Sequence, residues 1–589
     1  MSEIIENTDS VSELESNESK HEKKEEYAYL EKGGFSSEKF KIELRGLPKF
    51  YGIVELKKLM NEKLGLNASK IKRPRVSSNW LFACFQNEEE RNKAITALNG
   101  YSWKGKTLTA EEAKPAPDPL VRKRKQGNSN DAQDKKKKEM ENKSQEERLK
   151  DATTPYWNIP YEEQLKIKEK EIRQLLMKYD NEMWIKNFNK RSEIEAKRKL
   201  HNGLSFDLLG IKGSPVTEGY RNKCEFTVGY DEENQLTVGF RLGAYATGTI
   251  CVGPVAELNH ISDAMKEAVI LFQDFVRKSN LPPFSPADYS GHWKGLTVRH
   301  SSFSNEIMLI VLMHPQDLSQ EELDKIKKDL IDFFSTEEAV TCGIKSLYFE
   351  LVTKRKSGEE PSKAVHLMGA THIVDSILGL QFRVSPEAFF QVNTAAANIL
   401  YQSAIEMSEV KSDSTVVDIC CGTGTIGLSF AKHCNKVLGL EMVPEAVKDA
   451  KANAELNGVT NCEFFTGKAE DILPSVLARA ASDVVAIVDP PRAGLHMRAI
   501  TQLRNAYRVK RLIYISCSPA SAVKNFVDLS RQCSKTLRGA PFVPVRHMIV
   551  DMFPHTKHVE LAVLFEREKI PDTSGNVELP EGYNDYAYF

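Results

Sequence analysis

Cys517 occupies a position in the sequence where a thiol can do chemistry. It follows the apolar run 511–515 and stands among turn-forming residues, in the order Ser-Cys-Ser-Pro. A thiol must be held in a polar, partly exposed place to react as a nucleophile, whereas most cysteines are small buried hydrophobes. The end of a strand meets this requirement. The sequence therefore predicts that Cys517 is a nucleophile.

Two carboxylates are candidates to work beside this thiol. Asp489 follows the apolar run 483–488 and opens the stiff turn Asp-Pro-Pro-Arg, which ends at Arg492. Because the carboxyl ends of parallel strands meet at one edge of a sheet, we expect Asp489 to lie near Cys517. Glu560 begins a later apolar strand. Its position alone fits a solvated glutamate at a strand end better than a catalytic base.

A nucleotide-binding turn lies earlier in the chain. The apolar run 415–419 leads into the turn 420–427, Cys-Cys-Gly-Thr-Gly-Thr-Ile-Gly, then a helix and the strand 436–441, which ends in Glu441. In the doubly wound nucleotide-binding plan, such glycines let the backbone approach the ligand and the acid accepts both ribose hydroxyls. The turn by itself serves NAD(P) and S-adenosylmethionine equally. The Asp-Pro-Pro-Arg turn favours chemistry on a flat base beside the cofactor over hydride transfer.

The elements that must position these residues form an α/β pattern. From residue 415 onward, short apolar runs alternate with helical segments, which is typical of a parallel sheet covered by helices. The segment 205–385 is rich in strands, and its alternation predicts hairpins within 224–241 and 296–312. Residues 160–200 are charged and helical in propensity.

Composition and charge exclude several classes of protein. The 589 residues carry 81 Lys+Arg and 82 Asp+Glu, so a uniformly basic nucleic-acid coat is excluded, although local basic patches are not. No run of about 18 apolar residues occurs, so we expect no membrane span. The acidic start of the chain argues against a secretory or mitochondrial signal. None of the ten cysteines forms a C-x-x-C pair, so we expect no metal site and reduced thiols in the cytosol or nucleus.

Four ordered blocks of the sequence carry a resemblance to a known family. The blocks 489–494, 514–517 and 551–560 resemble signature blocks of the RNA 5-methyluridine methyltransferases, and 385–393 resembles a fourth. The similarity covers about 205–567. The chain departs from the family in having Ser518 and Ser521 where Asn and Thr are frequent, and in lacking the cysteine cluster that holds an Fe–S centre in some bacterial members.

The resemblance implies S-adenosyl-L-methionine as cofactor and methylation of uridine C5 in RNA. It implies that Cys517 adds to C6 of the uracil, which makes C5 nucleophilic, and that Glu560 then removes the C5 proton. It also implies that Arg492 steadies the oxyanion at O4. The positions that match cofactor-binding residues of the family are Gln391, Glu441, Asp489, Cys420 and Thr425, together with Gly422 and Gly424 of the turn.

Residues 40–112 resemble an RNA recognition motif. Such sheets stack bases on exposed aromatic side chains, and Trp80 and Phe82 occupy aromatic positions of its second signature strand. Glu43 stands where the first strand usually has an aromatic residue and Ser78 where the second has a basic one, so RNA contact through this sheet stays open. The combination with the methyltransferase blocks resembles eukaryotic tRNA-modifying members, which implies the T-loop uridine of cytosolic tRNA as substrate.

The predicted fold class is α/β, with a doubly wound, Rossmann-like methyltransferase domain, a strand-rich central RNA-binding domain and an N-terminal α+β RNA recognition motif. In the central domain, we expect four cationic side chains to hold RNA phosphates or a flipped nucleotide, or else to be solvated side chains of the strands: Arg221, Lys223, Arg241 and Arg299. The expected segments are 1–37, a disordered acidic tail; 38–115, the RNA recognition motif; 116–200, a basic linker and charged helix; 201–385, the central domain; 386–570, the methyltransferase domain; and 571–589, a tail.

Several alternatives remain open from the sequence. Adenine-N6 or glutamine methyltransferases usually carry an aromatic residue after the two prolines, where this chain has Arg492. A 5-methylcytosine enzyme also uses cysteine addition, and only the resemblance separates it from a uridine enzyme. An RNA-binding scaffold or chaperone with little catalysis is the alternative from another class. The basic runs 122–125 and 135–138 fit a nuclear signal, an RNA contact or a solvated linker. We expect a monomer that binds RNA, with neither metal nor membrane as partner.

Overall fold

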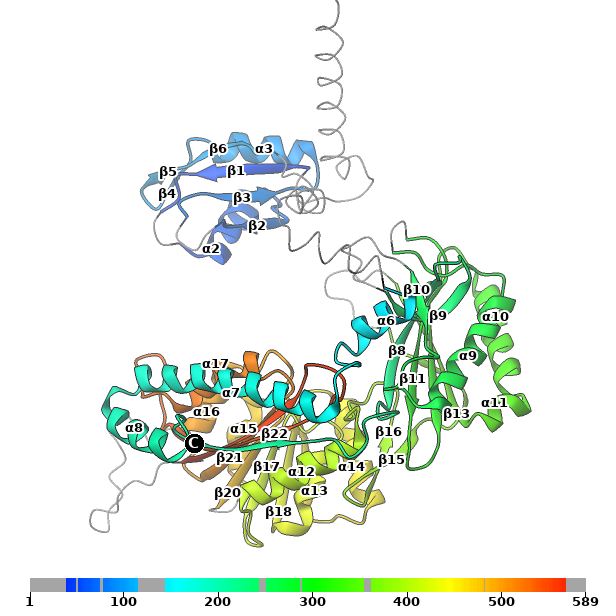
Figure 1. Ribbon diagram of the computed structural model, residues 1–589. Helices are drawn as coiled ribbons and strands as arrows, with labels where there is room; N and C mark the ends of the chain where they lie inside the picture. The colour runs from blue at the N-terminus through cyan, green and yellow to red at the C-terminus, as the bar shows by residue number, and fades with distance from the viewer. Residues whose placement is uncertain are drawn as a thin grey trace, which may run out of the picture. The chain divides into compact units, whose positions relative to one another are not determined.

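The protein comprises two compact units, Met1–Asn142 and Lys143–Phe589 (Figure 1). The computed structural model describes residues 39–48, 51–74, 78–114, 143–242, 251–286, 289–353, 362–480 and 483–567. The expected tails 1–37 and 571–589 and both basic runs of the linker lie outside these described residues.

The first unit is a four-stranded antiparallel sheet with two helical segments. Its strands have the order β2-β3-β1-β6, and the chain runs strand, helix, strand, strand, helix, strand. Ile42 and Leu44 alternate with polar residues along β1 and point into the core under the helices. The elements are β1 (Lys41–Arg45), α2 (Ile53–Lys58), the π-helical turn η2 (Leu59–Lys63), β2 (Lys70–Lys72), β3 (Leu81–Cys84), α3 (Glu88–Leu98), β4 (Ser102–Trp103), β5 (Lys106–Thr107) and β6 (Thr109–Glu112).

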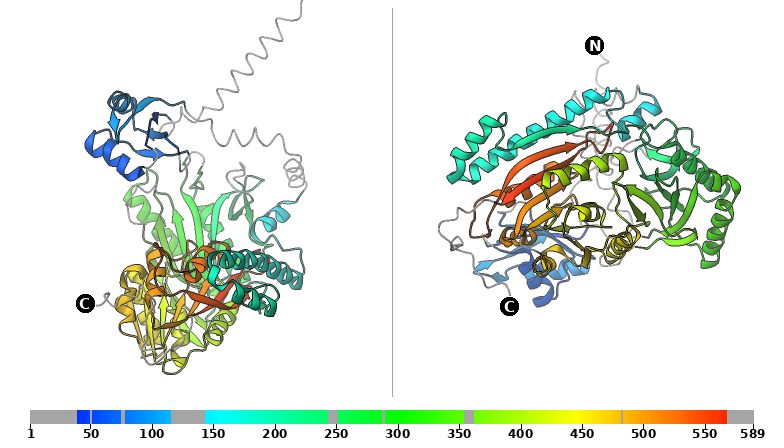
Figure 2. Two further views of the ribbon diagram at one scale, coloured as in Figure 1. Left: turned by 90° about the vertical axis from the view of Figure 1, so that its left-hand side faces the viewer. Right: turned by 90° about the horizontal axis from the view of Figure 1, so that it is seen from below.

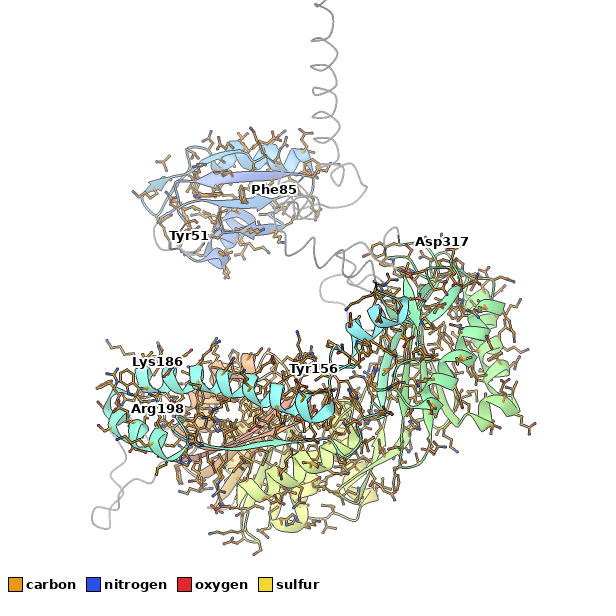
Figure 3. The ribbon with its side chains drawn as sticks, viewed as in Figure 1. Tyr51, Phe85, Tyr156, Lys186, Arg198 and Asp317 are labelled. Carbon is orange, nitrogen blue, oxygen red and sulfur yellow. The ribbon has the colours of Figure 1, made fainter. Side chains whose placement is uncertain are left out.

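The second unit begins with helices that pack on its main sheet. Leu176, Tyr179 and Met183 share one face of α7 and are buried in the same core cluster as the strands of that sheet. Arg198 of α8 donates to Asp180 of α7 at 2.5 Å, which folds α8 back along α7 (Figure 3). The elements are α6 (Gln145–Thr153), α7 (Tyr161–Lys186), η4 (Phe188–Lys190), α8 (Arg191–Leu200) and β7 (Asp207–Lys212). The helical propensity expected over 160–200 is present as α7 and α8, and the packing of α7 on the main sheet makes this part of the expected segment 116–200 belong to a core.

The central part of the second unit is a seven-stranded sheet with helices beside it. The strand order is β10-β9-β8-β11-β12-β13-β14, and the two predicted hairpins are present as the antiparallel pairs β8–β9 and β11–β12. The hairpin β15–β16 follows. The elements are β8 (Lys223–Tyr230), β9 (Leu236–Arg241), β10 (Val252–Pro254), α9 (Asp263–Lys278), β11 (Trp293–His300), β12 (Ile307–Met313), α10 (Gln320–Phe334), α11 (Glu337–Thr341), β13 (Ile344–Leu351), β14 (Val365–Gly369), β15 (Ile373–Ile377) and β16 (Leu380–Val384).

The main sheet of the second unit has eight strands in the order β19-β18-β17-β20-β21-β23-β22-β7. Strands β17 to β21 run parallel, β23 runs antiparallel to β21, and β7 pairs with β22. The elements are α12 (Thr394–Ser408), β17 (Thr415–Ile419), α13 (Thr425–Phe430), η6 (Ala431–His433), β18 (Lys436–Glu441), α14 (Pro444–Leu456), β19 (Cys462–Thr466), α15 (Ala469–Leu477), β20 (Val484–Val488), α16 (Met497–Asn505), β21 (Val509–Ser516), α17 (Pro519–Ser530), β22 (Phe542–Val550) and β23 (Glu560–Arg567).

Helices cover both faces of this sheet, which gives the predicted doubly wound α/β architecture (Figure 2). One core cluster holds residues of α12, α13 and α14, and the other holds residues of α7, α15, α16 and α17. Strands β17 and β20 are buried along their whole length because both of their faces are covered. The sequence placed residues 207–212 in the central domain, whereas they form the edge strand β7 of this sheet.

Two kinds of feature are absent from the described residues. In this part of the chain, no helix is both long and apolar enough to span a membrane. Within the same ranges, no group of three or more His, Cys, Asp or Glu side chains is arranged to hold a metal ion.

Candidate active site

The strand register brings the predicted nucleophile and both acids to one edge of the main sheet. Strand β20 runs parallel to β21, with Val488 beside Tyr514, so Asp489 and Cys517 both leave the sheet at its carboxyl edge. Strand β23 starts there in the opposite direction, since its second residue pairs with the last residue of β21. Glu560 therefore lies at the same edge. The predicted proximity of Asp489 and Cys517 is confirmed.

Cys517 is half-buried and responds to the charges of three neighbours. Burial raises the pKa of its thiol, and the negative charges of Glu560 and Asp489 raise it further. A hydrogen bond from the exposed Arg492 and the positive charge of this guanidinium act in the opposite direction. These four side chains, named here the thiol cluster, form one electrostatically connected group at the sheet edge.

The two acids of the thiol cluster are a coupled pair. Burial raises the pKa of Asp489 to about 7. Burial and the nearby Asp489 carboxylate hold the pKa of Glu560 well above its usual range. The Oε2 atom of Glu560 is buried and has no hydrogen-bond partner among the described residues. Glu560 is only 3% exposed, so the alternative of a solvated strand-end glutamate is wrong.

The glycine turn between β17 and α13 leaves room for a ligand beside an acid. The N–H of Gly422 donates to Glu441 Oε2 at 3.1 Å, and the N–H of Val443 donates to Oε1 at 2.9 Å. Gly422 has a φ of 54° and open space where a side chain would begin. Gly424 has a φ of 81°, and a Cβ there would lie 3.2 Å from Ala450 and the Phe464 ring. The backbone turn and the fixed carboxylate fit the ribose end of an adenosyl cofactor.

The other predicted cofactor residues lie in the segments before α12 and around the glycine turn. The hydroxyl of Thr425 lies 3.2 Å from that of Tyr401, which also has a hydrogen bond with Gln391. The Gln391 carbonyl accepts from Asn222 at 2.8 Å, which ties the segment before α12 to the start of β8. Cys420 is partly exposed, and burial with nearby acids raises its pKa to about 12, so it is a poor second nucleophile.

The predicted RNA-binding residues lie in both units. Arg221 is half-buried and donates to the Lys223 carbonyl at 3.0 Å, while the ammonium of Lys223 pairs with Glu225 at 3.0 Å. Arg299 is buried and donates to the backbone carbonyls of Pro386 and Ala388. It therefore fixes the loop before α12, and its predicted phosphate-binding role is wrong.

The aromatic pair predicted to contact RNA lies in the first unit. Trp80 and Phe82 are half-buried and form an edge-to-face contact with ring centroids 5.1 Å apart. The ammonium of Lys41 lies 4.5 Å from the Phe82 centroid, and the guanidinium of Arg45 lies 5.7 Å from the Trp80 ring. This face of the sheet combines aromatic rings with cations.

Sequence reasoning missed three residues near the site. Asp418 of β17 is buried, accepts from the N–H of Gly427 at 2.8 Å and has a pKa raised to about 7 by burial. Phe389, two residues before Gln391, is 64% exposed. Lys168 of α7 is fully buried against the segment that precedes Glu560. A charged residue inside the apolar run 415–419 was a visible signal for Asp418, whereas the position of Lys168 depends on contacts far apart in sequence.

Known proteins resemble this chain over most of its length. Residues 371–568 match the family model described as tRNA (Uracil-5-)-methyltransferase. The chain is 40% identical over 93% of its length to tRNA (uracil-5-)-methyltransferase homolog A of Homo sapiens and covers 86% of that protein. The chain belongs to the tRNA (uracil-5-)-methyltransferase family. The predicted resemblance, the enzyme class and S-adenosyl-L-methionine as the family's cofactor are thereby confirmed.

Another member of the family and one solved structure are also similar to a large part of this chain. The chain is 40% identical to tRNA (uracil-5-)-methyltransferase homolog B of Danio rerio over 72% of this chain and 88% of that one. The crystal structure of Pyrococcus abyssi tRNA (uracil-54, C5)-methyltransferase in complex with S-adenosyl-L-homocysteine is similar with a TM-score of 0.49 and 21% identity. That match covers 69% of this chain and 83% of the archaeal one. Helices α6 and α7 lie outside the family-model match.

Proposed function

We propose that this protein methylates C5 of a uridine in tRNA, and that the T-loop uridine of cytosolic tRNA is its main target. The observation that carries the proposal is the thiol cluster, in which the half-buried Cys517 is accompanied by the buried Glu560, the partly buried Asp489 and one arginine. This cluster stands at the sheet edge where doubly wound folds bind ligands, and β17 with its glycine turn is the neighbour of β20.

The residues around the glycine turn would hold and orient the cofactor. When bound, S-adenosyl-L-methionine supplies an electrophilic methyl group and a positive charge. Glu441 would accept hydrogen bonds from the ribose hydroxyls, and the open backbone at Gly422 would let the ligand approach. Gln391 and Thr425, which share the hydroxyl of Tyr401, close the other side. These residues would hold the methyl donor beside the uracil base.

Cys517 activates the uracil ring. Its thiol loses a proton to water, and the thiolate sulfur forms a bond to C6. The electrons of the C5–C6 double bond move to C5 and O4, which makes C5 nucleophilic toward the methyl group. The guanidinium of Arg492, which is exposed next to the thiol, stabilises the negative charge at O4.

Glu560 completes the reaction as the base. Once C5 carries the methyl group, the carboxylate takes the C5 proton, and the C5–H electrons re-form the C5–C6 double bond. The S–C6 bond breaks, and Cys517 leaves as a thiolate. A carboxylate with a raised pKa and an unpartnered oxygen suits this task, because a raised pKa makes it a stronger base than an ordinary glutamate.

The first unit is proposed to be an RNA recognition motif that holds the substrate. Its strand order and its face with Trp80, Phe82, Lys41 and Arg45 support this role, since bases stack on such rings and phosphates pair with such cations. Arg221 and Lys223 in the second unit are the other proposed contacts with the RNA backbone. The cytosol is the proposed location.

The test is base-resolution mapping of methyl groups on unmodified tRNA incubated with the protein and S-adenosyl-L-methionine. We expect 5-methyluridine at the T-loop with the wild type and with the control Cys251→Ala, and none with Cys517→Ala. Equal methylation by Cys517→Ala would refute the nucleophile. If the wild type binds RNA without methylating it, the alternative of an RNA-binding scaffold is supported. If it methylates cytosine, the proposal of uridine as the target base is wrong.

A further inference from the structure

Glu560 depends on a nine-residue loop for its position. Residues 551–559 connect the end of β22 to the start of β23, and Val550 pairs with Glu560 across this connection. The loop thus ends at the residue directly before Glu560, the proposed base. Movement of its first residues would move the end of the β22–β23 ladder and the Glu560 carboxylate with it.

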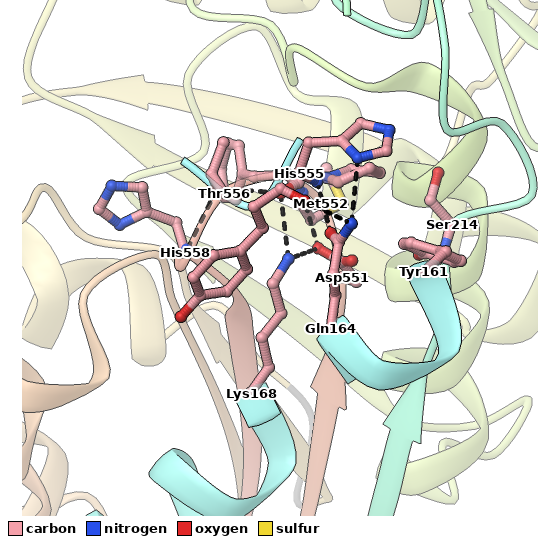
Figure 4. Close-up of polar contacts among 12 residues, drawn as sticks. Tyr161, Gln164, Lys168, Ser214, Asp551, Met552, His555, Thr556 and His558 are labelled. Atoms are coloured by element: carbon pink, nitrogen blue, oxygen red, sulfur yellow. Dashed lines mark hydrogen bonds and ion pairs between the residues drawn. The ribbon is translucent and has the colours of Figure 1, made fainter. Parts of the chain in front are cut away.

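Lys168 of α7 binds the first residues of this loop. Its ammonium lies 2.7 Å from Asp551 Oδ1 and 3.1 Å from the Phe553 carbonyl, and neither charged side chain is exposed (Figure 4). The same Asp551 oxygen accepts from the N–H of Phe553 at 3.1 Å. A buried ion pair stabilises little by itself, but it permits one geometry of the groups around it.

A second residue of α7 binds the middle of the loop. Gln164 lies one turn before Lys168, and its Oε1 accepts from the N–H of His555 at 2.8 Å. Its Nε2 lies 3.1 Å from His555 Nδ1 and donates to the Ile159 carbonyl at 2.8 Å (Figure 4). Helix α7 therefore holds the loop at two points, with side chains from one face.

The loop is also held by residues that precede β8 and α12. The hydroxyl of Tyr220 donates to the Pro554 carbonyl at 3.0 Å, and Asn393 donates to the Met552 carbonyl at 3.2 Å. These contacts restrain backbone carbonyls. Among the described contacts, only Lys168 neutralises a charge of the loop.

We propose that Lys168 is a positioning residue for the proton abstraction by Glu560, and that helix α7 is therefore a working part of the active site. The inference rests on the proposed function, because it assigns Lys168 to one step of that reaction. Lys168 lies far before residues 371–568, the part that matches the family model.

The position of the Lys168 contacts makes the effect specific to one step. They involve the loop before Glu560, whereas Cys517 lies in the turn between β21 and α17 and the glycine turn lies after β17. Loss of Lys168 should leave addition to C6 and methyl transfer largely intact. It should slow removal of the C5 proton and the breakage of the S–C6 bond that follows.

The test follows both products in a single turnover of the full chain with tRNA. We compare Lys168→Met with Lys170→Met, a control that removes an exposed lysine from the same helix. We expect Lys168→Met to accumulate the methylated covalent protein–RNA complex, with release slowed about tenfold to hundredfold, the scale on which misplaced groups lose rate. The rate at which the methyl group reaches RNA should match that of the control.

A double variant separates positioning from folding. Lys168→Met with Asp551→Asn removes both charges, so no carboxylate is left buried without its partner, and the fold should recover stability. Because the loop still lacks its anchor, slow release of the complex should persist. If release instead recovers with stability, the role of Lys168 is structural only.

The remaining outcomes distinguish this inference from the proposed function. Release by Lys168→Met at the rate of Lys170→Met, with both proteins forming the complex, overturns the inference and leaves the proposed function in place. An equal slowing of methyl transfer and release also overturns it. Absence of any complex in the wild type trapped with 5-fluorouridine RNA contradicts the proposed function itself.

Discussion

Asp489 and Glu560 reach Cys517 from the two strands that neighbour its own. Asp489 follows β20 and Glu560 begins β23, and β21, which Cys517 follows, lies between them in the sheet. Because β23 runs antiparallel to β21, Glu560 lies beside Cys517 although it follows the cysteine by 43 positions. One edge of the sheet thus brings together a nucleophile and two acids that repel each other's negative charge.

Glu560→Gln should stop the enzyme as a covalent complex. The amide cannot accept the C5 proton, so methyl transfer proceeds and elimination does not. A denaturing gel should show protein bound to RNA, and mass spectrometry should place a methylated uridine on Cys517. Glu566→Gln, at the far end of the same strand, is the matched control and should turn over normally. Free 5-methyluridine released at the wild-type rate would contradict the role of Glu560.

The rate of adduct formation should rise with pH, because the thiolate is the reactive form and the pKa of Cys517 is raised. Glu560→Gln removes a negative charge that raises this pKa, so its rate profile should shift to lower pH. Arg492→Met removes the opposing positive charge, so its profile should shift to higher pH. Trapping with 5-fluorouridine RNA across about pH 6 to 9, the range around the ordinary thiol pKa, measures both. Shifts of the same sign would show that these charges do not act on the thiol.

Glu441→Ala should weaken cofactor binding. Hydrogen bonds to a charged group contribute about 1.5–3 kcal/mol, so we expect a loss of about tenfold to hundredfold in affinity for S-adenosyl-L-homocysteine by calorimetry. Glu445→Ala, which changes an exposed acid of α14, should bind as the wild type does. An unchanged affinity in Glu441→Ala would remove Glu441 from the cofactor site.

Removal of residues 1–142 should leave a folded enzyme. The chain divides at this point into two compact units, and the second contains the thiol cluster, the glycine turn and α7. We expect cooperative melting, retained binding of S-adenosyl-L-homocysteine and weaker affinity for tRNA. Trp80→Ala in the full chain should weaken tRNA binding in the same direction if the sheet face contacts RNA. Unchanged affinity in both variants would remove the first unit from substrate binding.

Lys168→Met should destabilise the protein by about 3–5 kcal/mol, because it leaves the Asp551 carboxylate buried without its partner. The double variant with Asp551→Asn should recover a large part of this loss. Chemical denaturation of the two variants and of Lys170→Met measures the difference. A single variant as stable as the control would mean that water or another cation reaches Asp551.

The sequence predicted the main sheet well because its information is local. The run 415–419 coincides with β17, and Glu441 ends β18 as expected, since apolar runs bounded by turns define buried strands. The proximity of Asp489 and Cys517 followed from one rule about parallel strands. Glu560 could not be placed in this way, because its burial depends on β23 turning back beside β21.

The burial of one face of α7 could not be predicted from local sequence patterns. Charged residues dominate its sequence, so the helix itself was predictable, whereas its packing on the main sheet was not. Its partners lie hundreds of residues later: Lys168 meets Asp551 across 383 positions. The pairing of β7 could not be predicted for the same reason, because β7 pairs with the distant β22 and not with the strands that follow it in the sequence.

This long separation has a consequence for how the chain is made. A ribosome releases α7 and β7 early, with a lysine that has no acid to pair with and a strand that has no neighbour, and it makes β22 and β23 among the last of the described residues. Until α17 and β22 are made, the apolar face of α7 lacks partners such as Phe526 and Ser530, and an uncovered apolar surface is the kind that chaperones bind. The second unit can therefore complete its fold only near the end of translation. A chain that stops before β22 would lack both Glu560 and Asp551, the partner of Lys168 in α7.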